Sequence, residues 1–226
     1  MLRHRLVVAT GNRGKLDELR VLLGDLPLDV QGVGEILREP PWVVEDGATF
    51  ADNAMKKARA VADATMCLCL ADDSGLEVDA LGGGPGVHSA RFAHARASDA
   101  ENNAALLAAL DARSAWGGAH RGPGVGAGLA ARFRCALALV DPFDRGRPRI
   151  AEGVCEGSVL REPRGSGGFG YDPLFLVGGQ DRTMAELSAD EKNRVSHRAA
   201  AIAALRPEIE LALAHRATLP VGMTAP

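Results

Sequence analysis

The sequence predicts an α/β protein with a mixed central sheet and flanking helices, and three observations lead to this prediction. Short apolar segments typical of buried strands are interspersed with longer segments whose apolar residues recur at helical spacing. Two further strand-like segments follow one another directly, as antiparallel neighbours do. The 226 residues contain no internal repeat and no apolar run approaching the roughly 18 residues of a membrane span.

In the N-terminal part, strand, turn and helix signals come in order. Residues 5–10 are typical of a buried strand, and residues 11–14 form a glycine-containing turn into a leucine-rich amphipathic stretch. Residues 49–64 repeat the helical signal. The apolar run 66–70 then meets two aspartates, as a central strand that ends at a polar rim would.

In the C-terminal part, Ser98 with Glu101 and Thr183 with Glu186 form the Ser/Thr-x-x-Glu pattern that begins helices. A helix is predicted over 196–214, with its internal proline as a kink or a restart. The predicted strands are 132–140, 149–160 and 172–177.

The length favours one domain, with or without two lobes. We expect this domain to span 1–217, with a glycine-rich insertion at 114–128 and a flexible tail at 218–226. The glycine-rich stretch is either a loop within the fold or a disordered insertion without a function.

Charge and cysteine content exclude several classes of protein. The net charge of -3 gives no broad attraction to nucleic acid or an anionic membrane, so an anionic ligand must be met by local cations. The apolar run 6–9 is too short for a signal-peptide core, which makes a cytoplasmic location the expectation. The four cysteines lie among apolar neighbours without zinc-type spacing, and we expect buried, inert thiols.

The first candidate site is the turn after the first strand. Its glycines let the backbone approach phosphates, the following helix offers amide groups, and its lysine adds a cation. A Walker phosphate loop is excluded because Ala9 and Leu16 occupy its required glycine and hydroxyl positions. An ordinary strand-to-helix turn stays open as an alternative. The residues of the turn are Thr10, Gly11, Asn12, Arg13, Gly14 and Lys15.

The second candidate site is the acid pair Asp72 and Asp73. Carboxylates gathered at a strand end can hold Mg²⁺ while one of them draws a proton from water. Adjacent strand residues face opposite sides, so the two acids are not expected to share one role. The alternative is a turn in which Asp and Ser cap backbone amides. Asn53 and Lys57, four apart in the predicted helix, share a helical face.

The third candidate site is a glycine-flanked aromatic loop, which can offer a ring to stack on a base and polar groups to recognise its edge. Its residues are Phe169, Gly170, Tyr171 and Asp172. The cations Lys192, His197 and Arg198 follow it in the sequence, and ordinary surface charge would also explain them.

Together these segments resemble the inosine triphosphate pyrophosphatase family, which acts on non-standard purine nucleoside triphosphates. The matches fall in order and span roughly residues 6 to 200. They are Thr10-Gly-Asn-x-x-Lys15, Thr49-Phe-x-x-Asn53-Ala-x-x-Lys57, Ala71-Asp-Asp-Ser-Gly-Leu-x-Val-Asp-Ala-Leu81, Pro85-Gly-Val-x-Ser-Ala-Arg91, Gly167-Gly-Phe-Gly-Tyr-Asp-Pro173 and Ser196-His-Arg198. His88 departs from the pattern, since an aromatic such as tyrosine is commoner there.

The resemblance implies a mixed α/β fold with two lobes around a nucleotide cleft, and a homodimer. It implies hydrolysis of ITP, dITP and XTP to the monophosphate and pyrophosphate by attack at the α-phosphate. Asp73 matches the general base, and Glu45 with Asp73 the magnesium ligands; Asp72 is left to support the site. The triphosphate positions are residues 10–15, Ser74 and Lys192, and the base pocket is formed by residues 169–172 with His197 and Arg198.

Two other functions stay open. A Maf-type nucleotide pyrophosphatase would share the sheet and the acid-plus-magnesium chemistry but prefer other bases. A non-catalytic nucleotide sensor would need the phosphate turn and the base pocket, but no general base.

Overall fold

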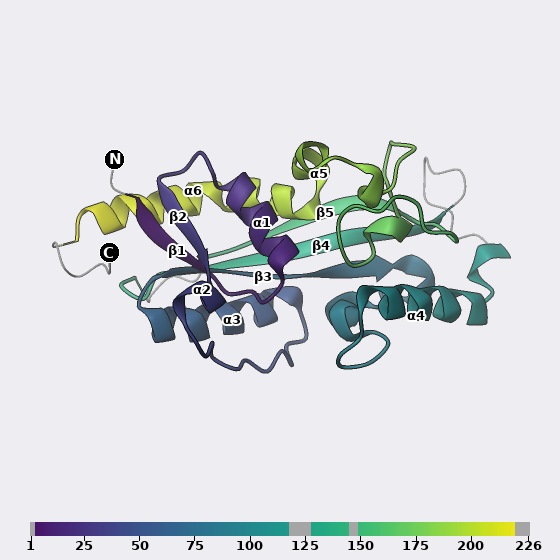
Figure 1. The fold of residues 1–226 in the computed structure, drawn as a ribbon, viewed down its shortest axis with the longest axis horizontal. Helices are drawn as coiled ribbons and strands as arrows, with labels where there is room; N and C mark the ends of the chain where they lie inside the picture. Colours follow the sequence, from purple (N-terminus) through teal and green to yellow (C-terminus); the bar gives the residue numbers. More distant parts are fainter. Residues whose placement is uncertain (1–2, 118–127, 145–148, 220–226) are drawn as a thin grey trace. The chain divides into compact units, whose positions relative to one another are not determined.

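The computed structural model describes residues 3–117, 128–144 and 149–219 (Figure 1). Most of the glycine-rich insertion predicted over 114–128, and most of the predicted tail, lie outside the described residues. The described start of the insertion contains a 3-10 turn, η3 (Ala115–Gly117), in which Ala115 is buried.

The sheet and its helices confirm the predicted mixed α/β fold. Six strands are ordered β2-β1-β3-β4-β5-β6; β1 pairs in parallel with β2 and β3, and β5 pairs antiparallel with β6. The strands are β1 (His4–Val8), β2 (Leu28–Gly32), β3 (Leu68–Val78), β4 (Leu129–Val140), β5 (Arg149–Val159) and β6 (Phe175–Val177). The helices are α1 (Arg13–Leu22), α2 (Val33–Ile36), α3 (Phe50–Thr65), α4 (Asp99–Ala112), α5 (Ala189–Val195) and α6 (His197–Ala217).

The chain divides into two compact units, and β3, β4 and β5 each supply residues to both. Unit 1 contains Met1–Asp73, Cys135–Gly153 and Arg198–Pro226. Unit 2 contains Ser74–Arg134 and Val154–His197. The single domain over 1–217 stays a prediction.

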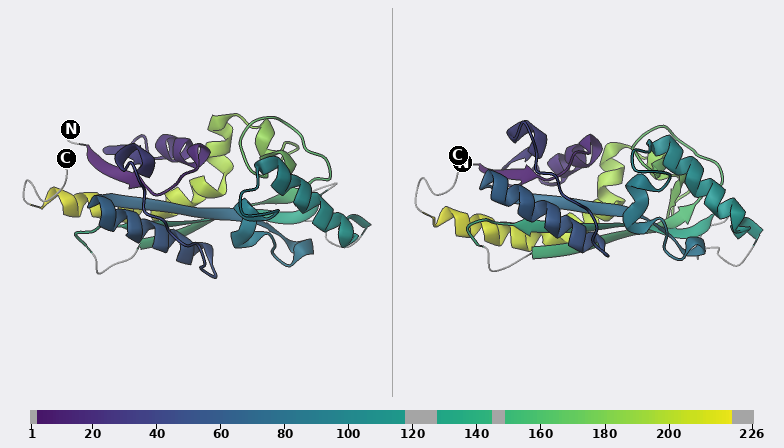
Figure 2. Two further views of the ribbon diagram at one scale, coloured as in Figure 1. Left: turned by 60° about the horizontal axis from the view of Figure 1, so that its bottom comes forward. Right: turned by 90° about the horizontal axis from the view of Figure 1, so that it is seen from below.

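Unit 1 has one apolar cluster on each face of its sheet. The period of two in β3 sends Leu68 and Leu70 into the cluster with α1 and α6, and Cys69 and Ala71 into the cluster with α3. Figure 1 and Figure 2 show α1 and α6 on one side of these strands and α3 on the other. The same alternation therefore directs the next two side chains, Asp72 and Asp73, to opposite faces of the sheet.

Unit 2 is built around α4 and the second half of β3. Leu106 and Leu110 of α4 are fully buried and belong to one cluster with Leu76, Phe133 and other apolar residues. Ser98 caps α4 by accepting a hydrogen bond from the Glu101 amide at 3.3 Å, and the Glu101 carboxylate accepts one from the Ser98 amide at 2.7 Å. The predicted capping box is confirmed, and α4 begins where the sequence indicated.

Two strand predictions were wrong. β3 does not end at a polar rim: it continues through both aspartates to Val78, because cations from neighbouring helices satisfy the charges in the strand. The segment predicted as a strand over 172–177 begins instead as a 3-10 turn, η4 (Asp172–Leu174), in which Pro173 cannot donate a ladder hydrogen bond. Only its last three residues form β6.

Other boundaries agree or were missed. Thr49 caps α3 by accepting from the Asp52 amide at 3.1 Å, so α3 begins as predicted. α6 is one helix to Ala217 with Pro207 inside it, because buried residues on both sides of the proline anchor the helix to unit 1. β2, α2 and α5 were not predicted. The Thr183 pattern begins only a short 3-10 turn, η5 (Met184–Glu186).

Candidate active site

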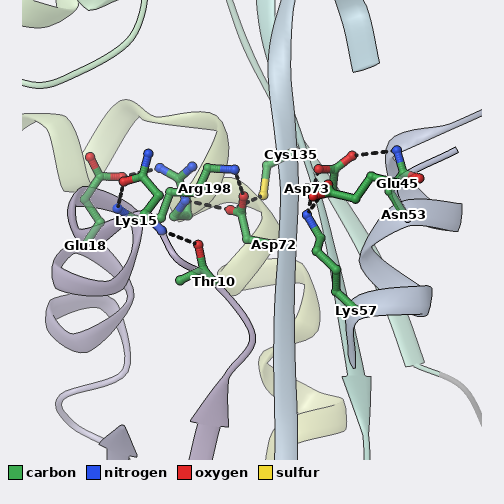
Figure 3. Close-up of polar contacts among 11 residues, drawn as sticks. Thr10, Lys15, Glu18, Glu45, Asn53, Lys57, Asp72, Asp73, Cys135 and Arg198 are labelled. Atoms are coloured by element: carbon green, nitrogen blue, oxygen red, sulfur yellow. Dashed lines mark hydrogen bonds and ion pairs between the residues drawn. The ribbon is translucent and has the colours of Figure 1, made fainter. Parts of the chain in front are cut away.

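The two aspartates of β3 lie on opposite faces of the strand, as the sequence predicted. Figure 3 shows Asp72 directed toward Lys15 and Arg198, and Asp73 directed toward Lys57 and Asn53. Both residues are buried: Asp72 is 1% exposed and Asp73 8%. The capped-turn alternative is wrong, since these residues are paired strand residues and not a turn.

The Asp73 face contains a second carboxylate and a shared cation. Lys57 Nζ lies 2.8 Å from Asp73 Oδ1 and 2.8 Å from Glu45 Oε2. Asn53, one turn earlier on α3, donates its amide to Asp73 Oδ2 at 3.3 Å. The same Asn53 accepts a bond from the Gly47 amide at 2.7 Å, which ties the loop that carries Glu45 to α3. The predicted i, i+4 pair thus contacts Asp73 from one helical face.

The environment separates the proton affinities of the two carboxylates. Burial raises the pKa of Asp73 despite the attraction of Lys57. Burial also opposes ionisation of Glu45, but there the charge and hydrogen bond of Lys57 outweigh it, and the pKa of Glu45 is lowered. Asp73 is therefore the stronger base of the pair. Divergent pKa values in a carboxylate pair distinguish the base from its partner.

The Asp72 face is a sealed ionic cluster. Lys15 Nζ lies 2.5 Å from Asp72 Oδ1, and Arg198 Nε lies 2.7 Å from Asp72 Oδ2. Arg198 also pairs with Glu18, and the Cys135 thiol donates to Asp72 Oδ2 at 3.1 Å. Burial alone would raise the pKa of Asp72, but the adjacent guanidinium and ammonium groups hold it well below its usual range.

The turn before α1 exposes the start of the helix. Asn12 caps the helix by accepting from the Lys15 amide at 3.1 Å, and Thr10 Oγ1 accepts from the Asn12 amide at 3.1 Å. Gly11, Asn12 and Arg13 are exposed, and no acid occupies the first turn of α1. A helix N-terminus without a nearby carboxylate attracts anions. Ser74 is half-buried and continues β3 directly after Asp73.

The aromatic loop belongs to unit 2 and has its own ion pair. Asp172 Oδ2 accepts from the Phe169 amide at 2.9 Å and lies 2.6 Å from Lys192 Nζ. Lys192 Nζ also lies 4.5 Å from the centre of the Phe169 ring. Gly168 has a φ of +72°, and a Cβ there would come within 2.0 Å of the Asp172 carboxylate. Only glycine fits this position.

The two aromatic residues of the loop differ in accessibility. The Tyr171 ring is buried, and its hydroxyl donates to the Ser89 carbonyl at 2.9 Å. Burial raises the pKa of Tyr171, so the hydroxyl remains a donor. Phe169 is half-buried, which makes it the ring of the pair with an accessible surface.

The remaining predicted residues divide between the units. His197 stacks on Phe133 in unit 2, with ring centres 4.9 Å apart and an angle of 19° between the ring planes. Lys192 contacts the aromatic loop in unit 2. Arg198 is buried beside Asp72 and Glu18 in unit 1. The triphosphate role of Lys192 and the base-pocket role of Arg198 stay predictions.

The sequence reasoning missed four residues. Glu18 and Cys135 belong to the Asp72 cluster, and Asp99 and Asn103 of α4 contact the aromatic loop. Helical spacing from Lys15 could have indicated Glu18. Nothing in the local pattern indicates the others, because their partners are distant in the sequence.

These features define a class of protein: an α/β fold with an anion-type turn, carboxylates that share a cation, and an aromatic loop, which suits a nucleotide with phosphates. Residues 6–208 match the Ham1 family, and the chain belongs to that family. The resemblance found in the sequence is thereby confirmed.

Individual relatives are similar over most of their length. A dITP/XTP pyrophosphatase of Desulforamulus reducens is 50% identical over 200 residues, which cover 88% of this chain and 92% of the relative. The solved structure of a HAM1 protein from Coxiella burnetii is 39% identical with a TM-score of 0.76, and the match covers 94% of this chain and 99% of that one. A dITP/XTP pyrophosphatase from Mycobacterium abscessus is 42% identical with a TM-score of 0.65, over 90% and 99% of the two chains.

Among the residues that the structure describes, no helix combines the length and the apolar character needed to cross a membrane.

Proposed function

We propose that this protein hydrolyses non-standard purine nucleoside triphosphates such as dITP, ITP and XTP to the monophosphate and pyrophosphate. Membership of the Ham1 family and the names of its relatives support the reaction and the substrate class. The observation that carries the proposal for the site is the arrangement at Asp73, a buried carboxylate whose pKa is raised and which shares one cation with Glu45.

The carboxylate pair fits a divalent cation. Glu45 Oε2 and Asp73 Oδ1 each lie 2.8 Å from Lys57 Nζ, so the two carboxylates are close neighbours that could hold a metal ion beside Lys57. Within the described ranges, no three His, Cys, Asp or Glu side chains form a metal-holding group. Two carboxylates suit Mg²⁺, which commonly takes its other ligands from substrate phosphates and water. When bound by Glu45 and Asp73 beside Lys57, Mg²⁺ would offset the charge that develops at the phosphates.

The residues of the Asp73 face then have distinct tasks. Asp73 accepts the proton of the attacking water, because it is the stronger base of the pair. Asn53 donates a hydrogen bond to Asp73 Oδ2. Lys57 binds the other Asp73 oxygen, Oδ1, and also binds Glu45. Lys57 keeps a fixed positive charge close to the reacting phosphate. Burial lowers the pKa of Lys57, but the charges and hydrogen bonds of Asp73 and Glu45 outweigh burial and raise it, so the charge persists at neutral pH.

The triphosphate and the base are assigned to the two other clusters. The exposed amides at the start of α1, with Lys15, take the phosphate oxygens. Asp72 holds Lys15 at the end of this turn through an ion pair. Phe169 stacks on the purine, and Asp172, His197 and Arg198 recognise its edge, while Lys192, beside Asp172, is assigned to the triphosphate with Ser74.

A substrate panel tests the proposal. Pyrophosphate release is measured with dITP, XTP, dGTP and dATP at equal concentration and with Mg²⁺ present. We expect turnover that favours dITP and XTP, whereas no turnover with nucleotide still bound would indicate a sensor. A preference for other bases would favour a Maf-type enzyme. Hydrolysis in ¹⁸O-labelled water should label the monophosphate alone, and label in pyrophosphate would refute attack at the α-phosphate.

We also propose a homodimer, which the resemblance to the family supports. Sedimentation equilibrium of the purified chain measures the mass directly, and a monomer at micromolar concentration would refute it.

A further inference from the structure

We propose that α4 positions the aromatic loop, and that Asp99 and Asn103 determine how well the site discriminates 6-oxo from 6-amino purines. This inference rests on the proposed function, because it takes residues 169–172 as the base pocket. Neither residue belongs to the motifs on which the resemblance depends.

Both hydrogen-bonding groups of a single loop residue are bound by α4. The Gly170 amide donates to Asp99 Oδ2 at 2.7 Å, and Asn103 Nδ2 donates to the Gly170 carbonyl at 2.9 Å. Asp99 and Asn103 are four residues apart and therefore share one face of the helix. α4 itself is anchored by its capping box and by fully buried leucines. The loop is thus connected to a rigid element at its centre.

Gly170 depends on these bonds for its position. Its φ is +62°, which favours glycine, and a Cβ built there would meet no atom within 4 Å, so no neighbouring group packs where a side chain would lie. Glycine also occupies positions 165, 167 and 168 of the same segment, and glycine backbones have the most conformational freedom to lose. Next to Gly170, Phe169 exchanges hydrogen bonds with Asp172 through its amide and carbonyl, and its ring contacts Lys192, so the α4 contacts are the ones that reach Gly170 itself.

The stability of the fold does not explain why position 103 is an asparagine. Its Oδ1 is buried and has no hydrogen-bond partner among the described residues, and such an atom costs free energy. An apolar residue at this helical position would avoid that cost. The bond to Gly170 is what asparagine adds there, and that bond acts on the residue between Phe169 and Tyr171.

The link to specificity follows from what the pocket must distinguish. A 6-oxo purine accepts a hydrogen bond where a 6-amino purine donates one, so discrimination depends on where the polar groups of the pocket are fixed. A displacement of the loop by a fraction of an ångström weakens the preferred contacts more than the unspecific stacking on Phe169. Loss of the α4 contacts should therefore reduce selectivity more strongly than it reduces the rate of the chemical step.

The experiment compares Asn103→Leu and Asp99→Ala with wild type, using dITP and dATP as substrates in the full-length enzyme. We expect the ratio of kcat/KM for dITP over dATP to fall about tenfold. We expect the change to lie in KM for dITP, with kcat within about twofold, since the Asp73 site is unchanged. Asp99→Asn keeps an acceptor oxygen and should restore most of the selectivity.

Asp111→Ala is the matched control. It removes a carboxylate from the last turn of the same helix, where it pairs with Arg161 and not with the loop. Its selectivity should equal that of wild type. An equal loss in Asp111→Ala, or unchanged selectivity in Asn103→Leu and Asp99→Ala at an unchanged Tm, overturns the proposal.

Hydrogen exchange separates this inference from the proposed function. Without nucleotide, the amide of Gly170 should exchange at least several-fold faster in Asp99→Ala than in wild type, while α4 keeps its protection. Unchanged exchange overturns the positioning role even if selectivity falls. Faster exchange in a protein that hydrolyses no triphosphate would instead support the positioning role and refute the proposed function.

Discussion

Asp72 and Asp73 are neighbours in one strand, yet their surroundings are opposite. Asp72 contacts two cations and a thiol in a closed cluster, and its pKa lies well below the usual range. Asp73 shares a single cation with Glu45, and burial raises its pKa. Strand alternation thus gives two adjacent carboxylates different chemistry, because each face of the sheet is covered by different helices.

The largest expected effect comes from Asp73→Asn. Removal of the base should lower kcat by at least about 10²- to 10⁴-fold with dITP as substrate. Because the pKa of Asp73 is raised in the folded state, its protonated carboxyl group stabilises the fold at a pH below the unfolded-state pKa. This contribution is lost as the pH rises through the folded-state pKa. At pH 7 the neutral amide should therefore leave Tm equal or higher. A fall in Tm that matches the loss of activity would show that Asp73 supports the fold and would contradict its role as the base.

The next effect is the loss of stability in Asp72→Asn. This change leaves Lys15 and Arg198 without their shared anion inside unit 1, and breaking a buried pair costs about 3–5 kcal/mol. Urea unfolding measures the free energy directly. Asp17→Asn, an exposed position on α1, serves as the control and should change it by less than about 0.5 kcal/mol.

The next effect concerns the Cys135 thiol, which donates a hydrogen bond to Asp72. Cys135→Ala removes a donor to Asp72 and a small buried volume, and should cost about 1–2 kcal/mol of the free energy of unfolding. Cys135→Ser keeps a donor but places a more polar group in the core. If Cys135→Ala were neutral, the thiol would not contribute to holding Asp72.

The smallest effect concerns Glu101, whose lowered pKa has a different origin. Bonds from the Ser98 amide and hydroxyl lower its pKa from 4.5 to about 2, without the buried cations that act on Asp72. A depressed pKa stabilises the fold above pH 4.5, and this contribution is lost as the pH falls toward 2. The Tm of Glu101→Gln should be slightly lower than wild type at pH 7, and the difference should shrink below pH 4. A difference independent of pH would contradict this origin.

The parts of the fold that the sequence predicted depend on local signals. α3 begins at its Thr49 cap, α1 follows its glycine turn, and the opposite orientation of the two aspartates follows from the period of two in a strand. Each of these features is determined by residues within a few positions of one another.

The parts that could not be predicted depend on distant partners. β3 continues past its apolar run because Lys15, Lys57 and Arg198, from three different helices, neutralise its acids. β2 has few apolar residues in sequence and becomes a strand through its pairing with β1. The contacts of Asp99 and Asn103 with Gly170 bridge about seventy residues, which no local pattern records.

The four buried cysteines have a consequence for measurements on this chain. All four are free, and burial raises the pKa of Cys69 and Cys135, and that of Cys155 to about 11. Reagents that modify thiols therefore react very slowly with these cysteines in the folded structure, because they attack the exposed thiolate form. Each modification then requires that the surrounding structure opens. Three of the thiols belong to unit 1 and Cys155 belongs to unit 2. The rate at which each thiol is modified therefore reports how often its own unit opens.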